Sequence, residues 1–158
     1  PPLDGHADLG NAAGVADAVG VADREPFGTL GPVTIGMIGE TTPQSTATIR
    51  ETLDAFEGHP DGADAPTQVI DAGPDEIERV AIVTGSGADW LGEAAERGAD
   101  ALIIGEGKGK VYHEAREAGI TVFLGGHYAT ETFGVRSLQT LSEEWGLETV
   151  YVSHPTGL

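Results

Sequence analysis

The chain has 158 residues and a mass of 16.2 kDa, enough for one ordinary domain or for one domain and part of another. It contains no cysteine, which excludes disulfides and thiolate ligands, so any metal must be held by oxygen and nitrogen. A net charge of −18, from 26 acidic against 8 basic residues, excludes a sequence-independent nucleic-acid binder, because phosphates would be repelled. The acidic residues are spread along the chain, which is typical of a halophile-type surface or of an ordinary highly soluble protein.

No apolar run approaches the roughly 18 residues that cross a bilayer, and no secretory signal is recognisable, so we expect a cytoplasmic protein without membrane contact. Residues 1–10 combine Pro, Gly and Asp without periodicity and predict a loop. Asn11 is a suitable N-cap for a short helix over Ala12–Val19, which Gly20 would end. Because the chain begins at Pro1 without a methionine, we expect it to be truncated.

The remaining residues, 31–158, alternate strands with helices. Val33–Ile38 predicts a buried strand, Thr42–Phe56 predicts a helix, and Thr67–Ile70 predicts a short strand. From residue 79 onward the alternation is regular, with strands at Val80–Thr84, Ala101–Ile104, Thr121–Leu124 and Thr149–Val152 and helices at Ala88–Arg97, Lys110–Ala118 and Tyr128–Trp145. Continuous apolar strands between helices predict an α/β fold, with a mixed or parallel sheet covered by helices on both faces.

Residues 125–135 read Gly-Gly-His-Tyr-Ala-Thr-Glu-Thr-Phe-Gly-Val and place His127 and Glu131 four positions apart, on one face of a helix. The apolar stripe that follows consists of Val135, Leu138, Leu141 and Trp145. Because this stripe points the same way, we expect the pair to face the packed side, where an unpartnered carboxylate is costly. A metal ion satisfies both groups at once, so a metal site is the leading interpretation. A histidine that packs at the helix start, with Glu131 in solvent, is the alternative.

Other candidates lie in loops and turns. Residues 105–110, Gly-Glu-Gly-Lys-Gly-Lys, hold both lysines of the chain before a helix, so Lys108 and Lys110 indicate contact with an anion such as phosphate. For residues 105–110, a flexible surface turn is the alternative, because the segment lacks the spacing of a Walker loop. Residues 84–87, Thr-Gly-Ser-Gly, lack dinucleotide-binding spacing and are interpreted as a structural turn. His113 lies on the helix that follows the two lysines. Because the ends of parallel strands share one edge of a sheet, it could line a cleft at that edge together with them. The alternative is that it packs on its own helix. Asp4 taken alone predicts only a capped turn.

In this order, the segments resemble the NIF three-like proteins, a family described as hexameric with a dinuclear metal centre. The matching blocks are Pro-Leu-Asp-Gly-His at 2–6, Leu-Gly-Asn at 9–11, Val-Ala-Ile-Val-Thr-Gly-Ser-Gly at 80–87, Tyr-His at 112–113, Gly-His-Tyr-Ala-Thr-Glu at 126–131 and His-Pro-Thr-Gly-Leu at 154–158. The resemblance implies two divalent ions (Zn, Fe, Mn or Ni), with Asp4, His127 and Glu131 among their ligands, and a homo-oligomer, in this family a hexamer.

Some relatives are labelled GTP cyclohydrolase type, which implies a metal-dependent hydrolase acting on a nucleotide whose triphosphate Lys108 and Lys110 would hold. The alternatives are a non-catalytic metal-binding or regulatory hexamer and a protein-interaction module. No catalytic acid or base is identified. The family's His-His-Gly block, which precedes Pro-Leu-Asp and supplies further histidine ligands, has no counterpart here. Residues 1–30 are therefore interpreted as the remnant of an N-terminal metal-binding half, and 31–158 as the α/β portion.

Overall fold

The centre of the molecule is a six-stranded sheet with the order β1-β2-β4-β5-β6-β3, in a computed structural model that describes residues 3–64 and 66–157. Three central strands are parallel, namely β4 (Ile77–Val83), β5 (Ala101–Ile104) and β6 (Thr121–Leu124). Antiparallel strands flank them, with β1 (Ala22–Leu30) and β2 (Val33–Gln44) on one side and β3 (Gln68–Ile70) on the other. The sheet is mixed, and the expected α/β class is confirmed.

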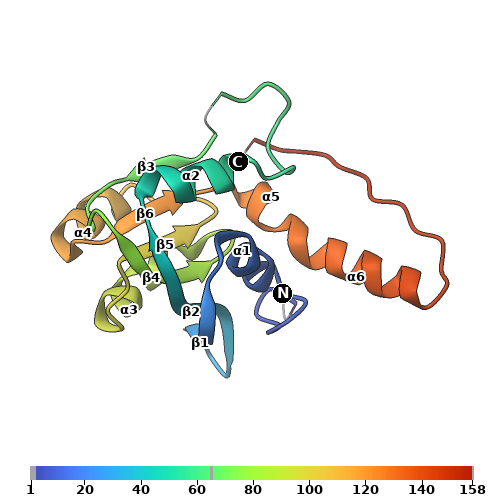
Figure 1. The fold of residues 1–158 in the computed structure, drawn as a ribbon, viewed down its shortest axis with the longest axis horizontal. Helices are drawn as coiled ribbons and strands as arrows, with labels where there is room; N and C mark the ends of the chain where they lie inside the picture. Colours follow the sequence, from blue (N-terminus) through green and yellow to red (C-terminus); the bar gives the residue numbers. More distant parts are fainter. Residues whose placement is uncertain (1–2, 65, 158) are drawn as a thin grey trace.

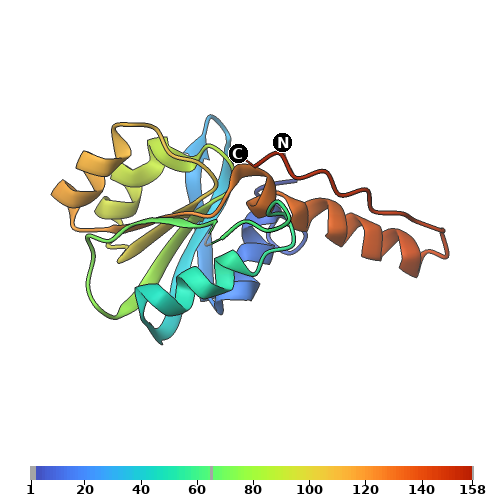
Figure 2. The ribbon, with the colours of Figure 1, turned by 90° about the horizontal axis from the view of Figure 1, so that it is seen from above.

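Helices cover both faces of this sheet (Figures 1 and 2). One face carries α1 (Asn11–Val19) and α2 (Thr46–Asp54), and the other carries the 3-10 turn η1 (Gly87–Trp90), α3 (Leu91–Glu96) and α4 (Val111–Ala118). Val80 and Ile82 of β4 pack with α1 and α2, while their neighbours Ala81 and Val83 pack with α3 and α4. Because β5 and the Val80–Val83 part of β4 are buried on both faces, their sequences are continuously apolar.

Strand β1, which forms a hairpin with the predicted strand β2, is the main element that the sequence does not predict. Residues 22–26, Ala-Asp-Arg-Glu-Pro, lack apolar alternation, and β1 forms by pairing with β2 at the sheet edge. β2 also continues to Gln44, which pairs with Ile77, so the helix expected from Thr42 begins only at Thr46. Ser45 is its N-cap and accepts a hydrogen bond from the Thr48 amide at 3.2 Å. The predicted division after residue 30 falls in the turn of this hairpin.

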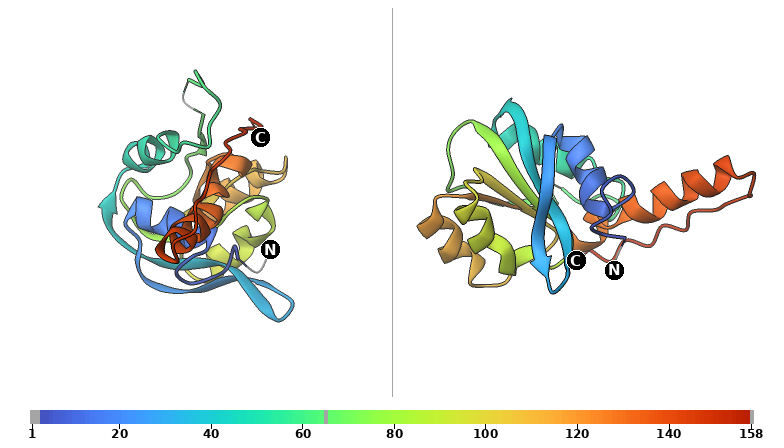
Figure 3. Two further views of the ribbon diagram at one scale, coloured as in Figure 1. Left: turned by 90° about the vertical axis from the view of Figure 1, so that its right-hand side faces the viewer. Right: turned by 90° about the horizontal axis from the view of Figure 1, so that it is seen from below.

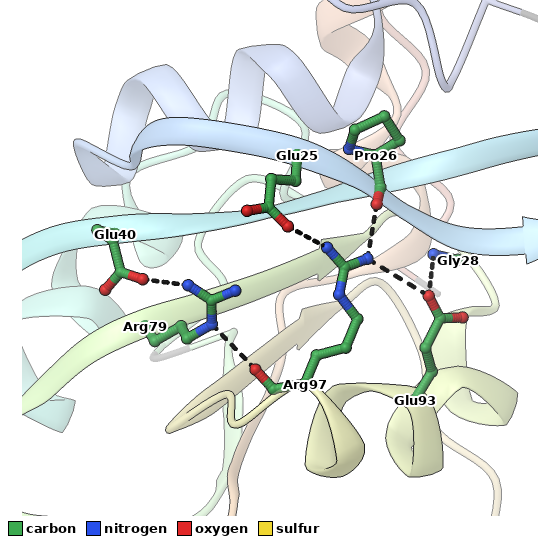
Figure 4. Close-up of polar contacts among 7 residues, drawn as sticks. All are labelled: Glu25, Pro26, Gly28, Glu40, Arg79, Glu93 and Arg97. Carbon is green, nitrogen blue, oxygen red and sulfur yellow. Dashed lines mark hydrogen bonds and ion pairs between the residues drawn. The ribbon is translucent and has the colours of Figure 1, made fainter.

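Two arginines join the hairpin to the parallel part of the sheet (Figure 4). Arg97, at the end of α3, pairs with Glu25 at 2.6 Å and donates a hydrogen bond to the carbonyl of Pro26 at 2.6 Å. Arg79 of β4 pairs with Glu40 of β2 and donates from Nε to the carbonyl of Arg97 at 3.0 Å. Partly exposed pairs of this kind contribute about 0–1 kcal/mol each, so they orient the edge strands more than they stabilise them.

The helix expected over Tyr128–Trp145 is two helices, α5 (His127–Thr130) and α6 (Thr132–Glu144), separated at Glu131. α6 projects away from the sheet, and the irregular chain after it returns alongside (Figures 1 and 3). The strand expected over Thr149–Val152 is wrong, because this segment lies beside α6 while β3 occupies the free edge of β6. No helix within the described ranges is long and apolar enough to cross a bilayer.

Candidate metal centre

The three parallel strands end at one edge of the sheet, and the turn after each contains glycine. The amide of Gly105, after β5, donates to the carbonyl of Gly85, after β4, at 2.8 Å. The amide of Gly126, after β6, donates in turn to the carbonyl of Gly105 at 2.9 Å. The three turns therefore lie side by side in strand order. This is the edge at which open α/β sheets bind their ligands.

The side chain of His127 lies at this edge between two carboxylates. Its Nε2 atom is 3.4 Å from Oε2 of Glu131, and its Nδ1 atom is 3.1 Å from Oε1 of Glu106. The predicted approach of His127 and Glu131 is therefore present in the structure. Their side chains are 37% and 32% exposed, so both are reachable from solvent.

The expectation that the apolar stripe lies on the packed side of the helix together with this pair is wrong. The residues of the predicted stripe are largely exposed, with relative exposures of 50% for Val135, 42% for Leu138 and 70% for Trp145. The helix breaks at Glu131, so the angular relation calculated for one continuous helix does not hold across it. Beyond its buried first turn, α6 projects away from the sheet. His127 and Glu131 themselves lie against the turn after β4, as expected for a pair that faces the packed side.

Gly85 forms a wall of the site. Its φ is +64°, and a Cβ atom placed on it would lie 2.3 Å from Oε1 of Glu131 and 3.0 Å from Nε2 of His127. The Thr130 hydroxyl accepts a hydrogen bond from the Gly85 amide at 3.3 Å and donates to the carbonyl of Gly126 at 2.9 Å. The absence of a side chain at this position thus lets the carboxylate of Glu131 and the imidazole of His127 lie directly against the backbone of the turn. The sequence interpretation of residues 84–87 as a purely structural turn overlooked this role.

Asp4 is held near the pair by Asn11. The Asn11 amide group donates to Oδ1 of Asp4 at 2.7 Å, and its oxygen accepts from the backbone N–H of Gly134 at 2.6 Å. This buried side chain therefore ties the N-terminal loop to the first turn of α6. The expectation that Asn11 caps α1 is wrong, because Gly10 occupies the N-cap and Asn11 begins the helix. Its side chain instead satisfies polar groups on two other segments.

The carboxyl group of Glu131 has a perturbed pKa. Burial raises the pKa of its carboxyl group, His127 opposes that rise, and the charge of Asp4 adds to it. A titratable group perturbed by burial and by a like charge, at the ligand-binding edge of a sheet, is a candidate functional site.

The donor types fit a divalent ion, since imidazole nitrogen and carboxylate oxygen suit Zn, Fe, Mn and Ni. Both types meet where Nε2 of His127 lies 3.4 Å from Oε2 of Glu131. Within residues 3–64 and 66–157, however, no three His, Asp or Glu side chains are grouped closely enough to hold an ion together. The residues therefore fit as part of a coordination shell.

The other predicted site residues have different partners. Lys108 and Lys110 both pair with Asp89 of η1, Lys110 at 3.2 Å, and their hydrogen bonds lower the pKa of that carboxyl group. Lys110 also lies 3.6 Å from Glu114 of α4. His113 is exposed, and its ring packs edge-on against Tyr112 with centroids 5.3 Å apart. The structure thus places the lysines with acidic residues of η1 and α4, apart from the contacts of His127.

Sequence reasoning missed Glu106 and Ser86. Glu106 follows β5 and contacts His127, which follows β6, and the Ser86 hydroxyl after β4 donates a hydrogen bond to Glu106. Both residues could have been identified from their position, because each directly follows a predicted strand. The sequence interpretation did not treat these two turns as partners of His127.

Two cavities adjoin this edge. One, of about 420 Å³, is lined by residues that include His59, Glu106, Leu124, Gly126 and Ala129. The other, of about 470 Å³, is lined by residues that include His127, Tyr128, Glu131, Val135 and Tyr151. Both volumes are in the range of small-molecule sites.

Known proteins with similar sequences cover nearly the whole chain. The family model of Duf34/NIF3 (NGG1p interacting factor 3) matches residues 1–156. A GTP cyclohydrolase 1 type 2 homolog of Halobacterium salinarum is 57% identical over 158 residues, 99% of this chain and 61% of its own length. Another of that name, from Deinococcus radiodurans, is 36% identical over 165 residues, 99% of this chain and 58% of its own length.

Solved structures agree with this assignment. A protein described as ybgI, of unknown function, superposes with a TM-score of 0.84 at 31% identity, covering 99% of this chain and 60% of the other. TTHA1606 from Thermus thermophilus gives a TM-score of 0.81 at 34% identity, with 99% and 60% coverage. The chain spans 61% and 58% of the two curated relatives above. It belongs to the Duf34/NIF3 (NGG1p interacting factor 3) family.

Proposed function

We propose that this chain supplies part of a divalent-metal site, with Asp4, His127 and Glu131 as ligands. The observation that carries the proposal is the 3.4 Å approach of Nε2 of His127 to Oε2 of Glu131, against the backbone of Gly85. The raised pKa of Glu131 supports it, because a cation would offset the cost of holding that carboxylate ionised and half-buried near Asp4. Two ions of Zn, Fe, Mn or Ni are proposed for the complete centre.

Metal binding is tested by elemental analysis and calorimetry with Zn and Mn. We expect Glu131→Gln to lower the bound metal markedly, because an amide oxygen is a weaker ligand than a carboxylate. Glu114→Gln is the matched control, since Glu114 is a partly exposed carboxylate on α4 that pairs with Lys110. Equal metal content in wild type and Glu131→Gln would contradict the ligand assignment.

We further propose that the complete centre hydrolyses a nucleotide, as the name GTP cyclohydrolase 1 type 2 homolog of its relatives suggests. A bound divalent ion supplies a Lewis acid and lowers the pKa of water toward neutrality. The cavity beside Glu106 supports a guanine-type ligand. His59 donates from Nε2 to the carbonyl of Leu53 at 2.9 Å, which leaves Nδ1 of a neutral ring as an acceptor. Glu106 and His59 therefore offer acceptors to a base that presents N–H donors.

Hydrolysis is tested by GTP turnover with Mn or Zn, in this chain and in a full-length relative. If Lys108 and Lys110 hold the triphosphate, Lys108→Ala raises KM without changing metal content. Stoichiometric metal without product would favour the alternative, a non-catalytic metal-binding or regulatory assembly. The ion pairs of Lys108 and Lys110 with Asp89 favour that alternative, because lysines paired with a carboxylate are less available to hold a triphosphate.

We also propose self-association, as a hexamer in the complete protein, through α6 and the segment after it. This region exposes several large apolar side chains, namely Val135, Leu138, Trp145, Leu147, Val150 and Val152. A patch of this kind marks an interaction surface. Light scattering tests the proposal, and the double variant Leu138→Ser with Trp145→Ser should lower the mass while the circular dichroism spectrum is kept. A wild-type monomer at high concentration would contradict it.

A further inference from the structure

The turns after β4, β5 and β6 carry a chain of polar contacts that no sequence motif marks. The Ser86 hydroxyl donates to Oε1 of Glu106, and the same oxygen lies 3.1 Å from Nδ1 of His127. The other ring nitrogen of His127, Nε2, faces Glu131 and the backbone of Gly85. One residue from each of three adjacent strand ends thus forms a line that stops at the proposed metal site.

The chemistry of these groups assigns the proton on His127. A carboxylate oxygen that already accepts a hydrogen bond from the Ser86 hydroxyl acts as an acceptor, so the hydrogen between Glu106 and His127 is placed on the ring. Nδ1 is the ring nitrogen closer to a carboxylate, at 3.1 Å from Glu106 against 3.4 Å for Nε2 from Glu131. In a neutral imidazole, which has one N–H, the hydrogen on Nδ1 leaves the lone pair of Nε2 directed toward Glu131.

We propose that Glu106 is a positioning residue that fixes the tautomer and ring orientation of His127, and that Ser86 anchors Glu106. The inference rests on the proposed metal site, because its purpose is to direct Nε2 of His127 as a ligand. Carboxylates commonly orient ligating histidines through the second ring nitrogen in this way.

A plain surface ion pair is the competing explanation, since Glu106 and His127 are 42% and 37% exposed. Two features argue against it. Exposed pairs seldom hold one geometry, whereas the oxygen of Glu106 that contacts His127 is also held by the Ser86 hydroxyl. In addition, the three residues follow neighbouring strands whose turns are hydrogen-bonded to one another. The backbone therefore brings Ser86, Glu106 and His127 close together, and no long flexible side chain has to bridge the space between them.

The first test measures the His127 tautomer in metal-free protein, by long-range proton–nitrogen NMR on ¹⁵N-histidine-labelled samples. We expect wild-type His127 to carry its ring hydrogen on Nδ1. Glu106→Ala should shift it toward the Nε2–H form. Glu106→Gln should retain part of the wild-type signal, because the amide oxygen still accepts. Glu114→Gln is the control and should leave the spectrum unchanged.

The second test measures Zn affinity in the same variants. Loss of an orienting partner lowers metal affinity about 10–100-fold while the stoichiometry is kept. Loss of stoichiometry in Glu106→Ala would overturn the positioning role and make Glu106 a ligand. A wild-type Nε2–H tautomer, or no tautomer change in Glu106→Ala, would also overturn it. Because the NMR test needs no metal, its failure is distinguishable from failure of wild-type protein to bind Zn, which would refute the proposed function.

Discussion

The backbone of Gly85 approaches the carboxylate of Glu131 so closely that a Cβ atom would lie 2.3 Å from Oε1. No real Cβ contact is that short, so any larger residue would displace Glu131 or the turn after β4. The contact links a turn that looks merely structural in the sequence to a predicted ligand 46 positions later. A substitution at Gly85 therefore tests the site without replacing any of the proposed ligand residues.

Gly85→Ala is expected to abolish metal-dependent stabilisation, because the methyl group would clash with Glu131 and displace it from His127. It should also lower thermal stability, since alanine at φ +64° costs about 1–2 kcal/mol. Gly31→Ala is the matched control, with φ +60° and no atom within 4 Å of the added Cβ. Thermal unfolding with and without Zn separates the two effects. Similar behaviour of both variants would show that the close contact of Gly85 with Glu131 is unimportant.

Glu131→Gln is expected to stabilise the metal-free protein at neutral pH. Burial, reinforced by Asp4, raises the pKa of Glu131 above its ordinary value of 4.5. A raised folded-state pKa contributes stability that is fully present below the unfolded value and is lost as pH rises through the folded one. Above that window the ionised carboxylate opposes folding, and glutamine removes this cost.

Urea unfolding of wild type and Glu131→Gln, at about pH 7 and below about pH 4.5, measures this effect. The advantage of the variant should shrink at the lower pH, where the wild-type carboxyl group is also neutral. Glu114→Gln serves again as the control for loss of one negative charge. A variant less stable than wild type at neutral pH would refute the assigned cause of the shift.

Asn11→Ala is expected to destabilise the protein by about 1–3 kcal/mol, because the buried N–H of Gly134 loses its acceptor. Asp4 also loses its tether, so metal affinity should fall as well. Asn11→Asp separates the two effects, since it keeps an acceptor for Gly134 but places a like charge beside Asp4. Chemical denaturation and Zn titration measure both. Unchanged affinity in Asn11→Asp would argue against Asp4 as a ligand.

Salt is expected to raise the unfolding temperature. With a net charge of −18, repulsion opposes the folded state, and about 1 M KCl shortens the screening length to about 3 Å. Ion pairs such as Arg97–Glu25 weaken under the same conditions, but partly exposed pairs contribute little. Thermal unfolding in about 0.1 M and about 1 M KCl gives the sign. A lower unfolding temperature at high salt would show that these pairs outweigh the repulsion.

The sequence by itself determined the central strands and the approach of His127 to Glu131. β5 and β6 begin and end where their apolar runs do, because strands buried on both faces need such runs whatever surrounds them. The histidine and glutamate meet because four residues of nearly helical chain bring their side chains together, which is a local property.

Only the tertiary structure decided which way that pair points and what completes it. α6 leaves the sheet, so its apolar side chains are exposed and the pair lies at the strand ends. Glu106, Ser86 and Gly85 reach His127 and Glu131 through the lateral pairing of β4, β5 and β6. β1 likewise forms only because β2 offers it an edge. Contacts between strands depend on which strands lie beside each other in the sheet. The periodicity of a single segment does not contain that information.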